Sequence, residues 1–518
     1  MLSSARQLIR PRPVDPSTAA IVCLAGFLAV ILLVGAQYAN LVARALPAIA
    51  FALCLSVLLV PQRSLTNLLV LATALSLPFA HFAVFIVAGQ GVQWAHLLGL
   101  LLIIHFAAQF LMGKPFRVAP AAPWVLAIVF ASALSALAIL GESDEHVAEF
   151  WKSAVQLAFG VLLFFAVTQV RLKEKLIPVV LKSMILLSAA VALFGIYQLP
   201  ARFLGWPGGV LRLTNPSLSG QMQVVFVIQY LIRAASIFSE PSYFGRYLVG
   251  MLALSLTAAL HSPRLFGRPF FLYLVIAVQI CALAMTSSMG AFYMLAMLLL
   301  LMFYFERGRQ RRALGNALFA IAIVGAFAFT IAQDISSFPI AQYLHNRLFG
   351  ICMYVITGGD TSYLVGGESI FMRIDTAKIA LDVWRDHPIL GVGLGSYTLT
   401  SLQYGNYNLF GFAANVLVNA LAETGIIGFI ALVGLSVSSL TGLWRVFRSG
   451  GGRGSDETNE NLRLVARMAF YLVFVEVLYF HVMGAFYWPS LWFYLGLGGM
   501  IALMARGEKT LPEGVRQP

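Results

Sequence analysis

Charged residues are scarce in this sequence. Only 11% of its 518 residues are Asp, Glu, Lys or Arg, whereas 60% are hydrophobic, and the mean hydropathy is +0.86. Soluble domains carry about 25% charged residues, so the composition excludes a large soluble core. Apolar windows of about 20 residues, the length of a membrane-spanning helix, recur along the chain. Because lipid cannot pair backbone polar groups and the alternation typical of a β-barrel is absent, the sequence predicts an all-α polytopic membrane protein.

Cysteine is also rare, and the motifs of soluble enzymes are missing. The four cysteines have no metal-binding spacing, and only Cys352 falls in a predicted loop, so no disulfide within a loop is expected. The chain contains no Gly-x-x-x-x-Gly-Lys loop, no His-Glu-x-x-His, no Cys-x-x-Cys, no nucleophile elbow and no Asp-x-Asp pair. The sequence therefore gives no support for ATP-driven or metal-dependent chemistry, and we expect no cofactor.

Hydropathy predicts about fourteen membrane helices, interrupted by two long polar gaps. The helices are placed near 19–36, 44–60, 66–88, 94–112, 121–140, 150–169, 176–198, 243–260, 268–286, 289–305, 313–332, 414–443, 464–484 and 487–505.

The short loops between these helices divide by charge. Lysine and arginine gather in alternate loops, as at Arg63, Lys114 and 307–312, whereas the opposite loops are neutral or acidic, as at 141–145. This positive-inside pattern explains the net charge of +13 without nucleic acid and predicts that both termini are cytoplasmic. The predicted order is seven helices within 1–198, an outer loop at 199–242, four helices within 243–332, a large outer loop at 333–411, three helices within 412–505 and a cytoplasmic tail at 506–518.

The large outer loop contains a predicted amphipathic helix from Ser369 to His387. Its basic residues, Arg373, Lys378 and Arg385, lie off the apolar face, where they are suited either to bind an anion or to remain solvated. His387 precedes Pro388 and is either a reactive imidazole or a cap of the helix end. The glycines that follow, Gly391, Gly393 and Gly395, predict a tight turn, whose amides could also approach a phosphate.

A second group of polar residues ends the first outer loop. Glu240 precedes Pro241, between Arg233 and Arg246, where the chain re-enters the membrane. Glu240 is either an ordinary acidic residue at a helix start or a carboxylate that activates or positions a sugar hydroxyl.

Several ionisable side chains fall within apolar windows, where such groups are suspected of function. Pairing inside the helix bundle is the simpler interpretation, and it applies to His81, His96, His105, Glu476 and His481.

These segments resemble a known family. The stretch from Trp384 to Tyr397 reads WRDHPILGVGLGSY, and Asn415 is followed by Leu-Ala-Glu-Thr-Gly-Ile-Ile-Gly at 421–428. Together they are similar to the signature of the bacterial O-antigen ligase and O-antigen polymerase superfamily. The stretch from Phe238 to Gly245, FSEPSYFG, is similar to the segment that these proteins carry where an outer loop re-enters the membrane.

The resemblance implies a metal-independent glycosyltransferase of the bacterial inner membrane. It would use undecaprenyl-diphosphate-linked oligosaccharides at the periplasmic face, with the large loop as a catalytic lid. The resemblance makes Arg233, Arg246, Arg373 and Arg385 the diphosphate-binding candidates and Glu240 and His387 the candidates for base or acceptor positioning. We therefore expect Arg385→Ala to abolish product. Membrane lipids and a chain-length-regulating copolymerase are further candidate partners, and nucleic acid is not expected.

One departure from the family favours a polymerase over a ligase. Ligases that attach glycan to the lipid A core usually have a histidine before the asparagine that begins the late helix, whereas this chain has Ala414 before Asn415. The prediction is a polymerase of O-antigen, capsule or exopolysaccharide repeat units. A ligase and, in another class, a transporter of polysaccharide or lipid-linked sugar remain the alternatives.

Overall fold

The structure is a computed structural model. It describes residues 62–87, 90–170, 177–211, 213–215, 227–228, 231–316, 353, 356–357, 368–405, 413, 415–448, 457–481 and 488–510. The helices predicted near 19–36 and 44–60, and all but the start of the one near 313–332, lie outside these residues.

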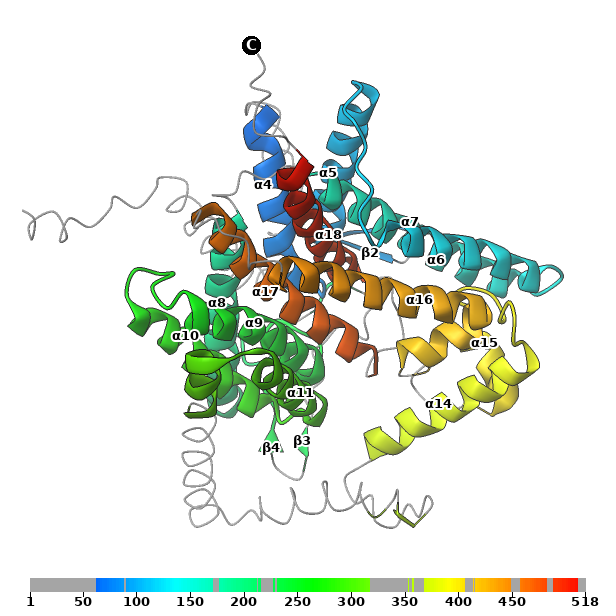
Figure 1. Ribbon diagram of the computed structural model, residues 1–518. Coiled ribbons are helices and arrows are strands. Elements are labelled where there is room, and N and C mark those ends of the chain that lie inside the picture. The colour runs from blue at the N-terminus through cyan, green and yellow to red at the C-terminus, as the bar shows by residue number, and fades with distance from the viewer. Residues whose placement is uncertain are drawn as a thin grey trace, which may run out of the picture.

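Long apolar helices dominate the described chain, which confirms the prediction of an all-α polytopic membrane protein (Figure 1). Seven helical segments there are long and apolar enough to cross a membrane. They fall in α5 (Trp94–Leu111), α6 (Ala122–Ser135) with the turn that extends it, α7 (Asp144–Gln169), α8 (Ile177–Leu204), α9 (Pro241–His261), α10 (Pro269–Thr286) and α16 (Val416–Arg448). The remaining bundle helices are α4 (Gln62–Ser76), α11 (Met289–Phe305), α17 (Glu457–Leu478) and α18 (Pro489–Thr510).

Proline marks the start of several of these helices. Pro241 begins α9, Pro269 begins α10 and Pro489 begins α18. Proline is tolerated in the first turn because the amide that it lacks has no partner within the helix there. The chain therefore re-enters the bundle at these residues.

The helix predicted near 66–88 is wrong in its second half. The α-helix ends at Ser76, a 3-10 turn covers Leu77–Phe79, and β1 (Ala83–Val87) then pairs antiparallel with β2 (Gln90–Gln93). Pro78 lies in the 3-10 turn, and proline disrupts a continuing α-helix. A second short hairpin in the first outer loop, β3 (Val227–Ile228) with β4 (Leu231–Ile232), was also not predicted.

Helix α9 is the centre of one half of the bundle. It packs against α8, α10, α11 and α17, and Leu248, Val249 and Leu252 on it are completely buried. Elsewhere α18 packs on α7, and α16 packs on α6. Burial on several sides fits a helix whose turns are apolar nearly all round.

The second outer loop forms a small unit with its own core. The predicted helix is present as α14 (Glu368–Asp386), and Figure 1 shows it apart from α9, α10 and α11. The short helix α15 (Tyr397–Thr400) and a 3-10 turn (Ser401–Tyr404) follow it. The core of this unit consists of Ile379, Ala380, Val383, Val392, Tyr397, Ala413 and Ala422. Its apolar face is therefore covered by protein.

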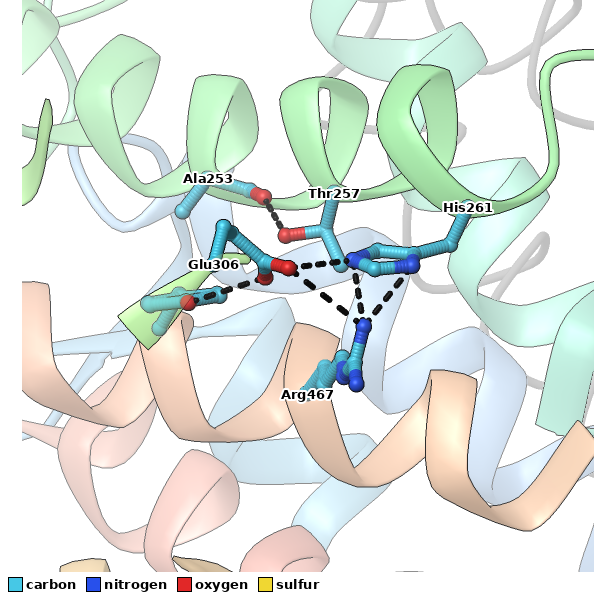
Figure 2. Close-up of polar contacts among 6 residues, drawn as sticks. Ala253, Thr257, His261, Glu306 and Arg467 are labelled. Carbon is cyan, nitrogen blue, oxygen red and sulfur yellow. Dashed lines mark hydrogen bonds and ion pairs between the residues drawn. The ribbon is translucent and has the colours of Figure 1, made fainter. Parts of the chain in front are cut away.

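A polar clamp joins α9, α11 and α17 at the end of the bundle where α9 ends (Figure 2). Glu306 Oε2, just after α11, lies 3.0 Å from His261 Nε2 and 3.5 Å from Arg467 Nη1. Tyr471 donates a hydrogen bond of 3.1 Å to Glu306 Oε1. Because Glu306 is buried, these contacts offset the cost of removing its charge from water.

Candidate functional site

Glu240 sits at the start of α9, as the sequence predicts. It is the N-cap residue, but its side chain makes no capping hydrogen bond to the helix. Its carboxylate accepts a hydrogen bond of 3.0 Å from Ser242 Oγ and remains partly exposed. Glu240 therefore presents an acidic group at this end of the bundle.

Arg246, one and a half turns further along α9, is buried with a carboxylate partner. It is 9% exposed, and its Nη2 group is bonded to Glu476 Oε2 on α17. Its guanidinium also lies over the Tyr479 ring, 4.3 Å from the ring centroid. Glu476, considered above as an intramembrane carboxylate, is thus paired inside the bundle. A buried pair of this kind fixes the guanidinium in one place.

Arg373 brings the second outer loop to the same place. The Arg373 side chain interacts electrostatically with Tyr243 and Tyr479, the two tyrosines that also interact with Glu240 and Arg246. We call these groups the arginine cluster: Arg246, Arg373, Glu240, Glu476, Tyr243 and Tyr479. Two of the four predicted diphosphate ligands and one of the two predicted bases therefore lie within electrostatic range of the same two tyrosines, although they come from different segments.

A cavity of about 50 Å³ adjoins the cluster. Aromatic side chains form much of its wall, with the Arg246–Glu476 pair at one side. Its lining residues are Leu77, Pro78, Ala80, His81, Gln93, Ala95, Phe238, Tyr243, Arg246, Tyr247, Glu476, Trp488, Pro489, Ser490 and Tyr494. Apolar and aromatic walls with a few polar groups are typical of small-ligand sites.

Arg233 lies near the same end of the bundle and is bonded to backbone. Its Nε donates a hydrogen bond of 2.7 Å to the carbonyl of Thr286, the last residue of α10. Arg202 Nη1 in turn donates to the Arg233 carbonyl at 2.7 Å. A cation at a helix C-terminus is stabilised by the helix dipole, so Arg233 fastens the first outer loop to α10.

Arg385 and His387 are not brought to the arginine cluster. Arg385 Nη1 bonds Asp382 Oδ1 at 2.5 Å, and its side chain is 70% exposed. Arg385 lies twelve residues along α14 from Arg373, which is about 18 Å of helix at 1.5 Å per residue. His387 is exposed beyond the end of α14, and its carbonyl accepts a 3.1 Å hydrogen bond from Gly391. That contact fits a helix-ending turn.

The three glycines form the predicted turn. Gly391, Gly393 and Gly395 all have positive φ, at 68°, 101° and 77°, a region that residues with a Cβ rarely adopt. Their neighbouring amides are already bonded: Val392 donates to the Ala422 carbonyl at 2.9 Å, Gly393 to the Glu423 carbonyl at 3.0 Å and Leu394 to Ser135 Oγ at 3.2 Å. These contacts attach the loop to α16 and α6, so the amides serve docking in place of phosphate binding.

Helix α16, predicted near 414–443, is present but broken. Gly425 has φ 64° and ψ −166°, and Ile426 after it donates a 3.0 Å hydrogen bond to the Pro388 carbonyl. Asn415 caps the first part, since its Oδ1 accepts from the amide of Leu417 at 2.9 Å. The segment before Gly425 joins the outer-loop unit, through Ala422, to the bundle core, through Val416 and Ala420, and the segment after it lies in the bundle.

Gly425→Ala is expected to undock this unit. The new Cβ would overlap the Ile389 carbonyl, in a backbone conformation that is essentially restricted to glycine. We expect a loss of about 3 kcal/mol or more, since the overlap adds to the backbone strain. Thermal unfolding in detergent measures the loss of stability, and limited proteolysis of the outer loop measures its undocking.

Gly405→Ala is the matched control for Gly425→Ala. Gly405 has φ 80° but no atom within 4 Å of a new Cβ, so only the backbone cost of about 1–2 kcal/mol is expected. Equal effects of the two changes would show that the contact with Ile389 does not hold the unit.

Comparison with known proteins bears on the same segments. Residues 271–433 match the O-antigen ligase family, Wzy_C. The match agrees with the resemblance to the O-antigen ligase and polymerase superfamily that the motifs indicated. No curated protein matches the chain. The matched stretch includes Arg373, the glycine turn and Gly425, whereas Glu240, Arg246 and Glu476 lie outside it.

The sequence missed the aromatic part of the site. Tyr243 and Tyr479 interact with both arginines, and Trp488 packs on Tyr243 with ring centroids 5.6 Å apart. Tyr243 lies within the FSEPSYFG stretch, which was a signal for its position. Trp488 lies at a predicted helix start with no motif around it, so only packing reveals it.

Proposed function

We propose that this protein is an inner-membrane polysaccharide polymerase with both termini in the cytoplasm. The growing chain, linked to undecaprenyl diphosphate, is the donor, and an incoming lipid-linked repeat unit is the acceptor. A non-reducing-end hydroxyl of the acceptor attacks the anomeric carbon of the donor. The bond to the diphosphate breaks with inversion, the hydroxyl proton passes to a base, and undecaprenyl diphosphate leaves.

The electrostatic influence of Arg246, Arg373 and Glu240 on the same two tyrosines is the observation that carries this proposal. Negative charge develops on the diphosphate as it leaves, and guanidinium groups stabilise it in a site that excludes water. Arg246 is held in place by Glu476, whereas Arg373 is supplied by the outer-loop helix. Docking of the loop therefore completes the site, which supports the interpretation of 333–411 as a lid. Glu240 is better placed than His387 to accept the proton.

The loop charges support a periplasmic position for this site. The cavity is lined by the chain just after α4, at the start of α9 and around the start of α18. These junctions lie opposite the arginine-rich loops, on the side that the positive-inside pattern assigns to the periplasm. The Glu306 clamp lies at the other end of α9, near the cytoplasmic loops.

A ligase is the second candidate, because the matched family is described by that activity. It would use the same donor site with lipid A core as acceptor. Ala414, in place of the histidine usual in ligases, favours the polymerase by analogy. A transporter would move the substrate without forming a glycosidic bond.

One assay separates these activities. Purified protein in nanodiscs receives lipid-linked repeat units from its host, without nucleotide or added metal, while glycan length and released undecaprenyl diphosphate are measured. A ladder of products with one diphosphate per bond is expected. Release only after addition of lipid A core would establish a ligase, and an intact donor under both conditions would reject the glycosyltransferase proposal.

A further inference from the structure

His81 lines the cavity beside the arginine cluster and has an unpaired ring nitrogen. The residue is 1% exposed, and its Nδ1 has no hydrogen-bond partner in the described part of the chain. Its ring packs against two aromatic rings, with centroids 5.7 Å from Phe238 and 5.4 Å from Tyr243. Buried polar atoms nearly always have a partner, so an orphan in a residue that lines a cavity suggests a ligand.

The chemistry of the cavity wall limits the chemical class of that ligand. His81 follows the helical segment that ends at Phe79, and burial lowers its pKa to about 3, so the ring is neutral. A neutral imidazole attracts a diphosphate weakly, whereas a hydroxyl pairs with either tautomer because it both donates and accepts. Tyr243 and Trp488 add aromatic faces, against which the apolar face of a sugar ring can pack.

We propose that His81 belongs to a saccharide subsite, where its Nδ1 forms a hydrogen bond with a hydroxyl of the lipid-linked sugar. The subsite lies next to the Arg246–Glu476 pair, so a hydroxyl-bearing edge of the sugar enters the aromatic cavity while the diphosphate lies toward Arg373. This inference rests on the proposed function for the identity of the ligand. It adds His81, Tyr243 and Trp488 as residues that select the sugar.

The test compares two ligands on the same protein. Full-length protein in nanodiscs is titrated with the host's undecaprenyl-diphosphate-linked repeat unit and with undecaprenyl diphosphate that carries no sugar. His81→Phe keeps a ring of similar shape beside Phe238 and Tyr243 but removes both nitrogens. Loss of one partner of a buried hydrogen bond corresponds to about a tenfold weaker Kd. We expect that change for the repeat unit and none for undecaprenyl diphosphate.

Three further variants guard against a purely structural effect. His105→Phe alters a histidine that is bonded to Thr66 Oγ1 at 2.7 Å, away from the cavity lining, and should leave both affinities unchanged. If His81→Phe does not fold, His81→Asn and His81→Leu replace it, because Asn keeps a polar atom near the Nδ1 position. The repeat unit should then bind about tenfold more tightly to the Asn variant than to the Leu variant.

The outcomes distinguish this inference from the proposed function. Unchanged affinity for the repeat unit in His81→Phe, or equal weakening for both ligands, would overturn the saccharide subsite. Diphosphate release by the wild type, measured in parallel, tests the glycosyltransferase proposal by itself. Protein that binds the repeat unit through His81 but releases no diphosphate would reject catalysis and support the subsite.

Discussion

Arg373→Ala is expected to lower glycan formation by at least about 100-fold, the usual effect of removing one group that stabilises a developing negative charge. Arg373 reaches the arginine cluster from α14, so its loss removes positive charge beside the leaving diphosphate. Arg373→Lys should recover part of the rate, because an ammonium group supplies the charge without the planar fork of arginine. Diphosphate release in nanodiscs measures both changes.

Arg385→Ala is the matched control on the same helix. Its side chain faces solvent and is paired with Asp382, and such exposed pairs contribute at most about 1 kcal/mol. An effect of about 1 kcal/mol would change a rate by about fivefold, so the amount of product should stay within about twofold of wild type. This reverses the expectation from sequence, where the motif alone placed Arg385 in the mechanism. Loss of product in Arg385→Ala with full activity in Arg373→Ala would move the diphosphate to the other end of α14.

Glu476→Ala is expected to destabilise the protein by about 3–5 kcal/mol, because it leaves the buried Arg246 guanidinium without its counter-charge. The neighbouring rings of Tyr479 and Trp488 cannot replace a carboxylate. The readout is thermal unfolding of the detergent-solubilised protein. Replacing both partners, with Arg246→Met and Glu476→Leu, should restore much of this stability without restoring glycan formation.

Glu149→Ala provides the comparison for a surface pair. Glu149 bonds Lys152 at 2.8 Å, but both side chains are more than a third exposed, so less than about 1 kcal/mol is expected. If Glu476→Ala proved as mild as Glu149→Ala, Arg246 would be stabilised by its aromatic neighbours and not by Glu476.

Hydropathy predicted most of the fold because lipid imposes one simple requirement on every spanning segment. The described helices α5 to α11 all lie where apolar windows indicated. The prediction near 66–88 failed because the chain remains apolar after Pro78 although it has turned into a hairpin. There the hairpin is held by contacts with distant residues, as when Thr214 Oγ1 donates a 3.2 Å hydrogen bond to the Ala83 carbonyl. No local pattern encodes such a contact.

The sequence indicated which polar residues could form the site, but not which of them lie close together. Glu240, Arg246 and Arg373 stood out as polar groups beside membrane segments, and the structure places all three within electrostatic range of Tyr243 and Tyr479. Arg385 stood out equally, yet it projects into solvent because helix α14 is long and docks along its other face. Motif spacing fixes neighbours within one helix, whereas the partner of Arg246 lies 230 residues further along the chain.

The 230 residues between Arg246 and Glu476 determine the order in which the site is built during membrane insertion. Arg246 enters the membrane with α9, long before the ribosome has made Glu476. Until α17 arrives, we expect the arginine, about one and a half turns from the start of α9, to reach toward the headgroups, as lone arginines in membrane helices do. We expect insertion of α17 to draw it into the bundle and insertion of α18, which carries Ser490 and Tyr494, to complete the wall of the cavity. The site is then assembled last, and a nascent chain that stops before residue 476 lacks part of that wall.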